Sequence, residues 1–217
     1  MTNIDSVDEH YQRVKHKTGY KSIYQLYIKR MLDIIICILM FPFLFIIMFP
    51  ISVAIKIEDR GPVFYSSKRL GVGFTEFGML KFRSMKVNAP DLRNEDGSTF
   101  NSKNDPRVTK IGKLLRETSL DELPQIFNVF MGQMSFIGPR AGDVESKDTY
   151  EEDEKDKLFI RPGITGYTQA YYRNNLGVRE KRMYDACYAH DVTFLLDLKI
   201  LLRTIKTVLF HENIYTN

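Results

Sequence analysis

The pattern of apolar and polar residues divides the chain into three parts. Residues 34–55, IIICILMFPFLFIIMFPISVAI, form an apolar run without a charged side chain. A run of about 20 such residues is long enough to cross the roughly 30 Å hydrocarbon core of a bilayer. Polar, basic sequence precedes it, and mixed sequence with Gly and Pro follows it. The pattern therefore predicts a basic N-terminal tail over residues 1–28, a membrane helix over 29–59 and a folded domain over 60–217.

The flanks of the apolar run favour a helix that returns to the face it entered from. Positive charge normally gathers on one side of a crossing, but here basic residues lie on both sides: Arg13, Lys15, Lys17, Lys21, Lys29 and Arg30 before the run, and Lys56, Arg60, Lys68 and Arg69 after it. Pro42 and Pro50 lie inside the run, and proline bends or breaks a helix. We expect a re-entrant helix that breaks within the membrane. A kinked single span and a buried helix of a soluble core are the alternatives.

Short strands and helices are predicted beyond the apolar run. Residues 62–67 and 75–85 have the composition of two strands, and Gly71 and Gly73 between them indicate a hairpin. Residues 86–107 are rich in Asn, Asp, Ser, Gly and Pro, which predicts a long loop of the kind that forms lids and binding elements. Apolar residues then recur at intervals of three and four between Val108 and Asn128, which predicts helix.

Two charged segments follow in the last third of the chain. Residues 151–157, EEDEKDK, have the mixed charge of a solvated helix face. Residues 194–210 place Lys199, Arg203 and Lys206 on one helical face, with apolar residues over the remainder. This predicts a basic amphipathic helix, which lies in a membrane interface or packs onto the domain.

Composition narrows the class of protein. The 217 residues carry a net charge of +4, and the basic residues are dispersed, so the sequence does not indicate a nucleic-acid binder. Dispersed arginines suit small phosphorylated substrates or an anionic membrane surface. The two cysteines, Cys37 and Cys187, lie far apart, which argues against a disulfide framework, and the four histidines show no zinc-ligand spacing with them.

The segment ETSLDELPQ contains the main candidate for chemistry, the adjacent acids Asp121 and Glu122. Ser119 followed three residues later by Glu122 also fits a capping box, in which the serine caps a helix and the glutamate bonds back to its N–H. Acidic residues are common in first helical turns because the helix dipole favours them there. The pair alone therefore leaves both interpretations open.

Several phrases together resemble one known family, the bacterial sugar transferases or monotopic phosphoglycosyl transferases. They are KRMLDIII, GPVFYSSKRLG, FGMLKFRSM, DPRVTKIGKLLRETSLDELPQIFNVFMGQMSFIGPR and RPGITGYTQAYYRNN, in the order of the family, and the similarity runs from Lys29 to near the end of the chain. Taken with the patterning, the resemblance implies a mostly helical α+β fold. This is a compact, membrane-associated domain with a small β-hairpin and an N-terminal re-entrant membrane helix.

The resemblance also implies an activity and a set of site residues. A sugar phosphate would pass from a UDP-sugar to polyprenyl (undecaprenyl) phosphate, with Asp121 as nucleophile, Glu122 as its catalytic partner, and UMP as the second product. Magnesium would bind at Asp121. Arg116, Arg140 and Arg173 match the family pattern and offer planar forks for phosphate oxygens.

The expected location is the cytoplasmic face of the bacterial inner membrane, on the inner leaflet, where the reaction starts polysaccharide or glycan assembly. A homo-oligomer is compatible with the sequence. Lys81 and Arg83 could also bind phosphate, but a structural ion pair is the simpler interpretation for them. The rival functions are a membrane-anchored nucleotide-sugar hydrolase and an inactive scaffold in which the acid pair only caps a helix. No motif identifies the sugar, because selectivity depends on pocket shape.

Overall fold

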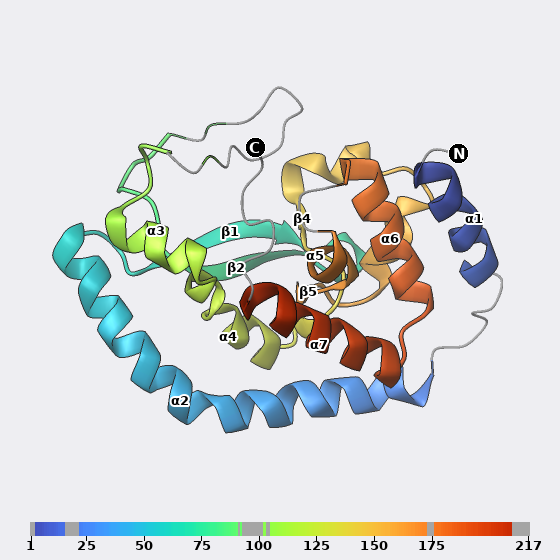
Figure 1. The fold of residues 1–217 in the computed structure, drawn as a ribbon, viewed down its shortest axis with the longest axis horizontal. Coiled ribbons are helices and arrows are strands. Elements are labelled where there is room, and N and C mark those ends of the chain that lie inside the picture. The colour runs from blue at the N-terminus through green and yellow to red at the C-terminus, as the bar shows by residue number, and fades with distance from the viewer. Residues whose placement is uncertain are drawn as a thin grey trace.

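The structure, a computed structural model, describes residues 3–15, 22–90, 92, 102, 105–172 and 176–209. It is mostly helical with a small sheet, which confirms the predicted α+β class (Figure 1). The helices are α1 (Asn3–Lys15), α2 (Lys29–Glu58), α3 (Lys110–Glu117), α4 (Gln125–Phe130), α5 (Tyr167–Tyr171), α6 (Val178–His190) and α7 (Phe194–Leu209). The strands are β1 (Phe64–Leu70), β2 (Glu76–Phe82), β3 (Ser135–Ile137), β4 (Gly142–Asp143) and β5 (Gly163–Thr165). Shorter helical turns are η1 (Tyr24–Ile28), η2 (Val72–Phe74), η3 (Leu120–Glu122), η4 (Val144–Thr149) and η5 (Glu154–Phe159).

The predicted hairpin is confirmed. β1 and β2 pair antiparallel from Phe64 opposite Phe82 to Leu70 opposite Glu76. Gly73 in the connection has φ of 62°, a left-handed conformation that glycine adopts without steric cost. β4 joins the other edge of β1, and β3 and β5 form a separate parallel pair.

One face of α2 packs on the domain. The buried residues Cys37, Leu44, Met48 and Ile55 recur at intervals of seven, four and seven, which places them on one helical face. They meet β2, α3 and α4 in the largest cluster of buried residues. The other side of α2 exposes large apolar residues such as Phe43, Ile46 and Phe49. Among the described residues, Tyr24–Glu58 is the one helix long and apolar enough to cross a membrane.

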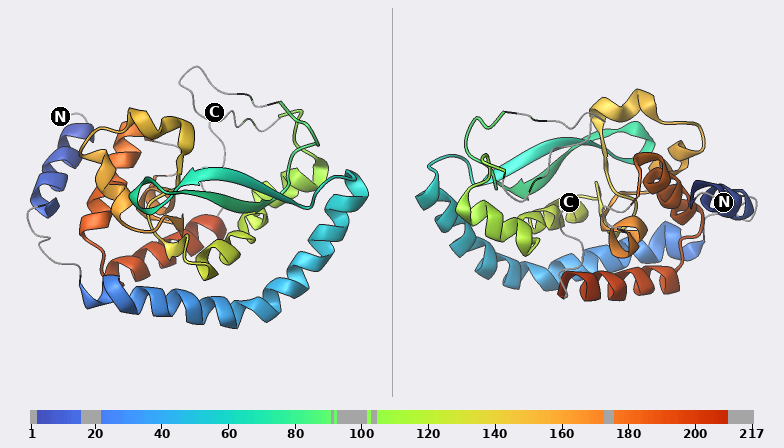
Figure 2. Two further views of the ribbon diagram at one scale, coloured as in Figure 1. Left: turned by 180° about the vertical axis from the view of Figure 1, so that it is seen from behind. Right: turned by 45° about the horizontal axis from the view of Figure 1, so that its top comes forward.

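Both ends of α2 are attached to the same domain. At its start, Lys29 pairs with Asp197 in α7, and Arg30 donates to the carbonyls of Val129 and Phe130 at 2.6 and 2.9 Å. At its end, the Glu58 carboxylate accepts two backbone N–H groups from the first turn of α3. The helix between these ends is continuous, so the expected break is replaced by a curve around the domain (Figure 2).

The two prolines explain why α2 curves without breaking. Pro42 and Pro50 each remove one helical hydrogen bond. Packing of the concave face against β2, α3 and α4 then holds the helix on both sides of each proline. Ser52, two residues after the second proline, bonds back to the Met48 carbonyl at 2.7 Å.

The N-terminal segment contains a helix that packs on α6. Of the predicted tail 1–28, residues 3–15 form α1, whose Val7, Tyr11 and Val14 are buried against Met183 and Cys187. The Tyr11 hydroxyl donates to Asp156 at 2.5 Å. Both cysteines, Cys37 and Cys187, are buried and free.

The interpretation of residues 151–157 as a solvated helix face is wrong for Glu154, Asp156 and Lys157, which are buried, while Glu151 and Glu152 are exposed. Glu154 and Lys157 are only 2% and 5% exposed. Arg182 of α6 lies 3.0 Å from the Glu154 carboxylate, and Asp185 lies 3.0 Å from the Lys157 amine. Burial is tolerated because α6 supplies a partner of opposite charge for each buried group.

The predicted amphipathic helix at the C-terminus is confirmed as α7. It packs on the domain through Ile200 and Asp197, while Leu195 and Leu202 stay exposed. α7 runs beside the first half of α2 (Figures 1 and 2), and both helices carry exposed apolar residues.

The long loop predicted over residues 86–107 lies mostly outside the described residues. At its described end, Arg107 and Asp105 are buried and joined by a forked pair, with Nη2 to Oδ2 at 2.6 Å. This pair fixes the chain just before α3.

A glycine allows α3 to dock on the strand that precedes it. A Cβ on Gly112 would lie 1.9 Å from the carbonyl oxygen of Ser84, just after β2. The same carbonyl accepts the Thr109 N–H at 3.1 Å, and the Ser84 hydroxyl accepts from Arg116 Nε at 2.9 Å. The close approach thus sets where α3 ends, immediately before the acid pair.

We expect Gly112→Ala to destabilise the protein, because a backbone carbonyl cannot move aside as a flexible side chain can. The overpacking should cost about 3 kcal/mol, or roughly 6–12 °C in Tm for a chain of this length. Gly177→Ala is the control, since its Cβ would meet nothing nearer than 3.5 Å. Thermal unfolding of both variants in the same detergent or nanodisc provides the measurement. Equal melting temperatures would contradict this account of α3 docking.

Candidate active site

The acid pair lies in a turn between two helices. α3 ends at Glu117, and the chain turns through Ser119, which has φ of 58° and ψ of 16°. Asp121 and Glu122 follow in η3, just before α4. Asp121 is buried and Glu122 is partly exposed. The turn brings a carboxylate into the protein at a point where helices meet β2.

The capping-box interpretation of this segment is wrong. Ser119 makes no side-chain cap bond to η3, and its left-handed conformation is not that of an N-cap. The Glu122 side chain bonds instead to Lys81 of β2, with Nζ to Oε1 at 2.7 Å. Tertiary contacts therefore hold the acid pair, and helix capping does not account for it.

Lys81 forms an ion pair, as the sequence favoured, and its partner is Glu122 of the acid pair. It comes from β2, 41 positions away in the chain, and its side chain is 20% exposed. Arg83, two residues later, differs: it is buried and pairs with Asp59 at 2.9 Å, so its role is structural. The contact between β2 and η3 brings Lys81, and not Arg83, to the acid pair. The spacing of the two residues along the chain does not show which of them reaches it.

The two carboxylates have different electrostatic environments. Burial raises the pKa of Asp121 to about 6, with Glu122 adding to the rise and Lys81 and Arg116 opposing it. Burial also acts to raise the pKa of Glu122, but Lys81, Arg140 and hydrogen bonds from Lys81 and Gln125 outweigh it, so that pKa is lowered. Glu122 is thus the firmly ionised member, and Asp121 the more basic one. Both are mainly charged at neutral pH.

A buried asparagine fixes α4 against β2. Asn128 is fully buried, accepts the Leu80 N–H at 2.9 Å and donates to the Gly78 carbonyl at 2.7 Å. These bonds lie next to Lys81 in β2, so they fix the strand and the helix on either side of the acid pair. Asn128 was not among the residues predicted from the sequence. The one sign of it in the sequence is that a polar residue stands among the apolar residues Ile126, Phe127 and Val129.

The predicted arginines lie in different places. Arg140 follows β3, its side chain is exposed, and its charge helps to lower the pKa of Glu122. Arg116 is bonded to Ser84 through Nε, and its charge acts on Asp121. Arg173 lies outside the described residues. The structure thus brings the acid pair, Lys81 and two of the three arginines within electrostatic reach of one another.

The acid pair fits a shared magnesium site better than a protein cage. Over the described ranges of the chain, no group of three or more His, Cys, Asp or Glu side chains is placed to hold a metal. Magnesium in phosphoryl-transfer sites often takes only one or two carboxylates, and substrate phosphates and water supply the other ligands. Asp121, which forms no side-chain ion pair with Lys81 or Arg116, has the donor chemistry for that role.

Comparisons with known proteins give matches over most of the chain. A family model described as "Bacterial sugar transferase" matches residues 24–211. The UDP-glucose:undecaprenyl-phosphate glucose-1-phosphate transferase of Xanthomonas campestris is 37% identical over 197 residues, which are 86% of this chain and 40% of that protein. The undecaprenyl-phosphate galactose phosphotransferase of Salmonella typhimurium is 35% identical over 203 residues, 87% of this chain and 42% of that protein.

A shorter relative matches nearly end to end. The exopolysaccharide production protein ExoY of Rhizobium meliloti is 34% identical over 202 residues, 86% of this chain and 88% of that protein. The chain thus spans about two fifths of the two longer relatives and most of this one. By the extent of the family match and by these identities, the chain belongs to the bacterial sugar transferase family.

Proposed function

We propose that the chain transfers a sugar phosphate from a UDP-sugar to undecaprenyl phosphate and so starts the assembly of a bacterial polysaccharide or glycan. Two relatives carry names for reactions of this type, on glucose and on galactose. The observation that carries the proposal is the buried Asp121 carboxylate beside a Lys81–Glu122 pair and the charge of Arg140. Phosphoryl transfer depends chiefly on such positioning and charge neutralisation.

The proposed reaction has two displacements at one phosphorus atom. An oxygen of Asp121 attacks the phosphorus next to the sugar, the bond to the bridging oxygen of the diphosphate breaks, and UMP leaves. An oxygen of undecaprenyl phosphate then attacks the same phosphorus, which forms the lipid diphosphate-linked sugar and releases the Asp121 carboxylate. A covalent step of this kind divides one difficult displacement into two.

The surrounding residues have distinct roles in this scheme. Asp121, with a pKa raised to about 6, is a more basic nucleophile than an exposed aspartate and is still ionised at neutral pH. Lys81 and Arg140 supply positive charge, and the exposed Arg140 guanidinium is free to reach phosphate oxygens. Glu122 either accepts a proton from the incoming lipid phosphate or holds Lys81 in place.

Magnesium would be held by Asp121 together with the donor diphosphate. When bound, it neutralises negative charge that would otherwise repel a carboxylate nucleophile. The partial exposure of Glu122 leaves the acid pair accessible to an ion shared with substrate.

The membrane arrangement that we propose is monotopic, on the inner leaflet. Both ends of α2 are attached to one domain, and its exposed side is apolar. α7 adds exposed leucines beside it, with Lys199 and Lys206 exposed as well. Such a surface enters one leaflet and returns, with basic side chains near the lipid headgroups. The active site would then lie near the membrane surface, where a lipid-linked phosphate can reach it.

We expect Asp121→Asn to lower lipid-dependent UMP release by about 1,000-fold or more, because the amide keeps the shape of the side chain and removes the nucleophile. The assay combines membrane-embedded protein, magnesium and a panel of UDP-sugars, with and without undecaprenyl phosphate. Asp148→Asn, an exposed position, is the control. With donor alone, the wild type should gain the mass of one sugar phosphate on Asp121.

Two results of this assay would reject the transferase. Continued UMP release without the lipid acceptor, beyond one equivalent of protein, would indicate a hydrolase. Unchanged glycan assembly in cells that carry Asp121→Asn would indicate a scaffold.

Lys81→Met should reduce UMP release by about 100-fold, because it removes a fixed positive charge beside the reacting phosphates and leaves Glu122 without its partner. Lys68→Met changes an exposed lysine on the neighbouring strand and should have little effect. Steady-state kinetics of both variants, with thermal melts to confirm folding, test the assignment. Equal activity of the two variants would remove Lys81 from the site.

Cysteine labelling tests the membrane arrangement. In a variant with Cys37 and Cys187 replaced by serine, Ser22→Cys and Arg60→Cys place single thiols before and after α2 at exposed positions. Both should react with an impermeant maleimide in inside-out vesicles, as should Glu152→Cys on the domain, and none should react in intact spheroplasts. Labelling of Ser22→Cys from the opposite side would indicate a spanning helix.

A further inference from the structure

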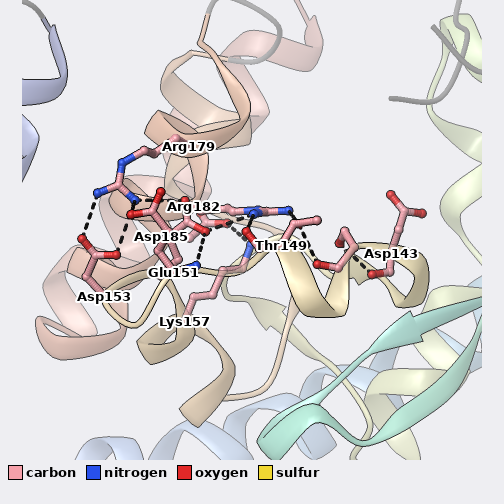
Figure 3. Close-up of polar contacts among 10 residues, drawn as sticks. Asp143, Thr149, Glu151, Asp153, Lys157, Arg179, Arg182 and Asp185 are labelled. Carbon is pink, nitrogen blue, oxygen red and sulfur yellow. Dashed lines mark hydrogen bonds and ion pairs between the residues drawn. The ribbon is translucent and has the colours of Figure 1, made fainter. Parts of the chain in front are cut away.

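A buried ion pair lies behind the loop that carries Arg140. Lys157 Nζ lies 3.0 Å from Asp185 Oδ2, and the two side chains are 5% and 1% exposed (Figure 3). Asp185 belongs to the face of α6 that also carries Arg179 and Arg182, six and three residues earlier. The pair is the innermost part of the charged contact between η5 and α6.

Asp185 has two further partners from other elements. Its Oδ2 also accepts the backbone N–H of Arg140 at 3.1 Å, and its Oδ1 accepts the Thr168 hydroxyl at 3.0 Å. One carboxylate therefore joins the loop after β3, the turn η5 and helix α5. Its position in the chain, 45 residues after Arg140, gave no sign of this contact.

The backbone before Arg140 is held from a different side. The Gly138 N–H bonds to the Thr165 carbonyl, and the Pro139 carbonyl accepts the Gly163 N–H, both at 2.9 Å. A Cβ on Gly138 would lie 2.5 Å from the Arg161 carbonyl oxygen, so this contact is as close as the backbone permits. These bonds to the β5 segment end at Pro139. Asp185 accepts the next backbone N–H, that of Arg140, whose charge helps to lower the pKa of Glu122.

We propose that Asp185, held in place by Lys157, is a positioning residue that fixes the backbone of Arg140 so that its guanidinium faces the acid pair and the donor diphosphate. The catalytic part of this inference rests on the proposed function. A fixed backbone matters because Arg140 is exposed and its long side chain would otherwise sample many directions. A charged acceptor also holds an N–H more strongly than a neutral one.

Two double variants separate positioning from simple support of the fold. Lys157→Met with Asp185→Asn removes both charges but keeps an oxygen to accept the Arg140 N–H. Lys157→Met with Asp185→Leu removes both charges and also the acceptor. Neither leaves a buried charge without its partner, which would by itself unfold the region. Thr168→Val in the Met/Asn background removes the third partner without touching Arg140.

Amide hydrogen exchange tests the contact whether or not the protein has the proposed activity. In membrane-embedded protein, peptides that contain Arg140 should exchange at least about 5-fold faster in the Met/Leu variant than in the Met/Asn variant. Peptides from α3 should be unchanged in both. Equal exchange at Arg140 in the two variants would overturn the inference.

Kinetics with UDP-sugar and undecaprenyl phosphate test the positioning role. The Met/Leu variant should lose about 100-fold in kcat/KM, close to the loss for Arg140→Ala. The Met/Asn variant, which keeps a neutral acceptor for the Arg140 N–H, should lose far less. In an Arg140→Ala background, Met/Leu should add little further loss, because both changes act through one guanidinium. The same added loss in both backgrounds would reduce Asp185 to a structural residue. A wild type inactive on every donor would refute the proposed function, and hydrogen exchange would still decide the contact.

Discussion

The attachment of both ends of α2 to one domain is the constraint on which the rest of the structure depends. Lys29 pairs with Asp197 at one end, and Glu58 receives two N–H groups of α3 at the other. A helix of 30 residues is about 45 Å long, so the elements between these anchors must follow its concave side. α7 stands at one end, α3 at the other, and α4 packs between them. The acid pair lies in the turn that joins α3 to α4, and its position therefore follows from that of α2.

That position also sets the electrostatics of the site. Asp121 is carried into the protein by the turn, where burial raises its pKa, while Lys81 is bonded to the neighbouring Glu122. Adjacent carboxylates with different environments can take different tasks, one as nucleophile and one as an ionised anchor or base. A lysine paired directly with Asp121 would lower its basicity. The strand–helix contact through Asn128 holds β2 beside α4, and Lys81 of that strand bonds to Glu122.

The domain also buries ion pairs away from the acid pair, between η5 and α6. The contact between η5 and α6 buries Glu154, Lys157 and Asp185 with their partners. Replacing such pairs with apolar residues can leave stability unchanged or raise it, so stability alone is a weak explanation for them. The hydrogen bond between the Arg140 N–H and Asp185 connects this network to the loop that carries Arg140. α1 extends the same packing on the outer side, where Tyr11 bonds to Asp156.

The sequence by itself determined the elements whose signals are local. The apolar run, the Gly-linked hairpin, the amphipathic helix that begins at Phe194 and the adjacent acids at 121 and 122 could all be predicted, because period, turn residues and motif spacing lie within short windows. Tertiary structure decided what depends on partners distant in the chain. It paired Lys81, and not Arg83, with the acid pair, and it replaced a predicted capping box with a left-handed turn. It also buried Glu154, Asp156 and Lys157, in a segment with the composition of a solvated face. The physical reason is the same in each case. The role of a charged or polar side chain depends on the group that it contacts in the folded protein, and the residues next to it in the chain do not show which group that is.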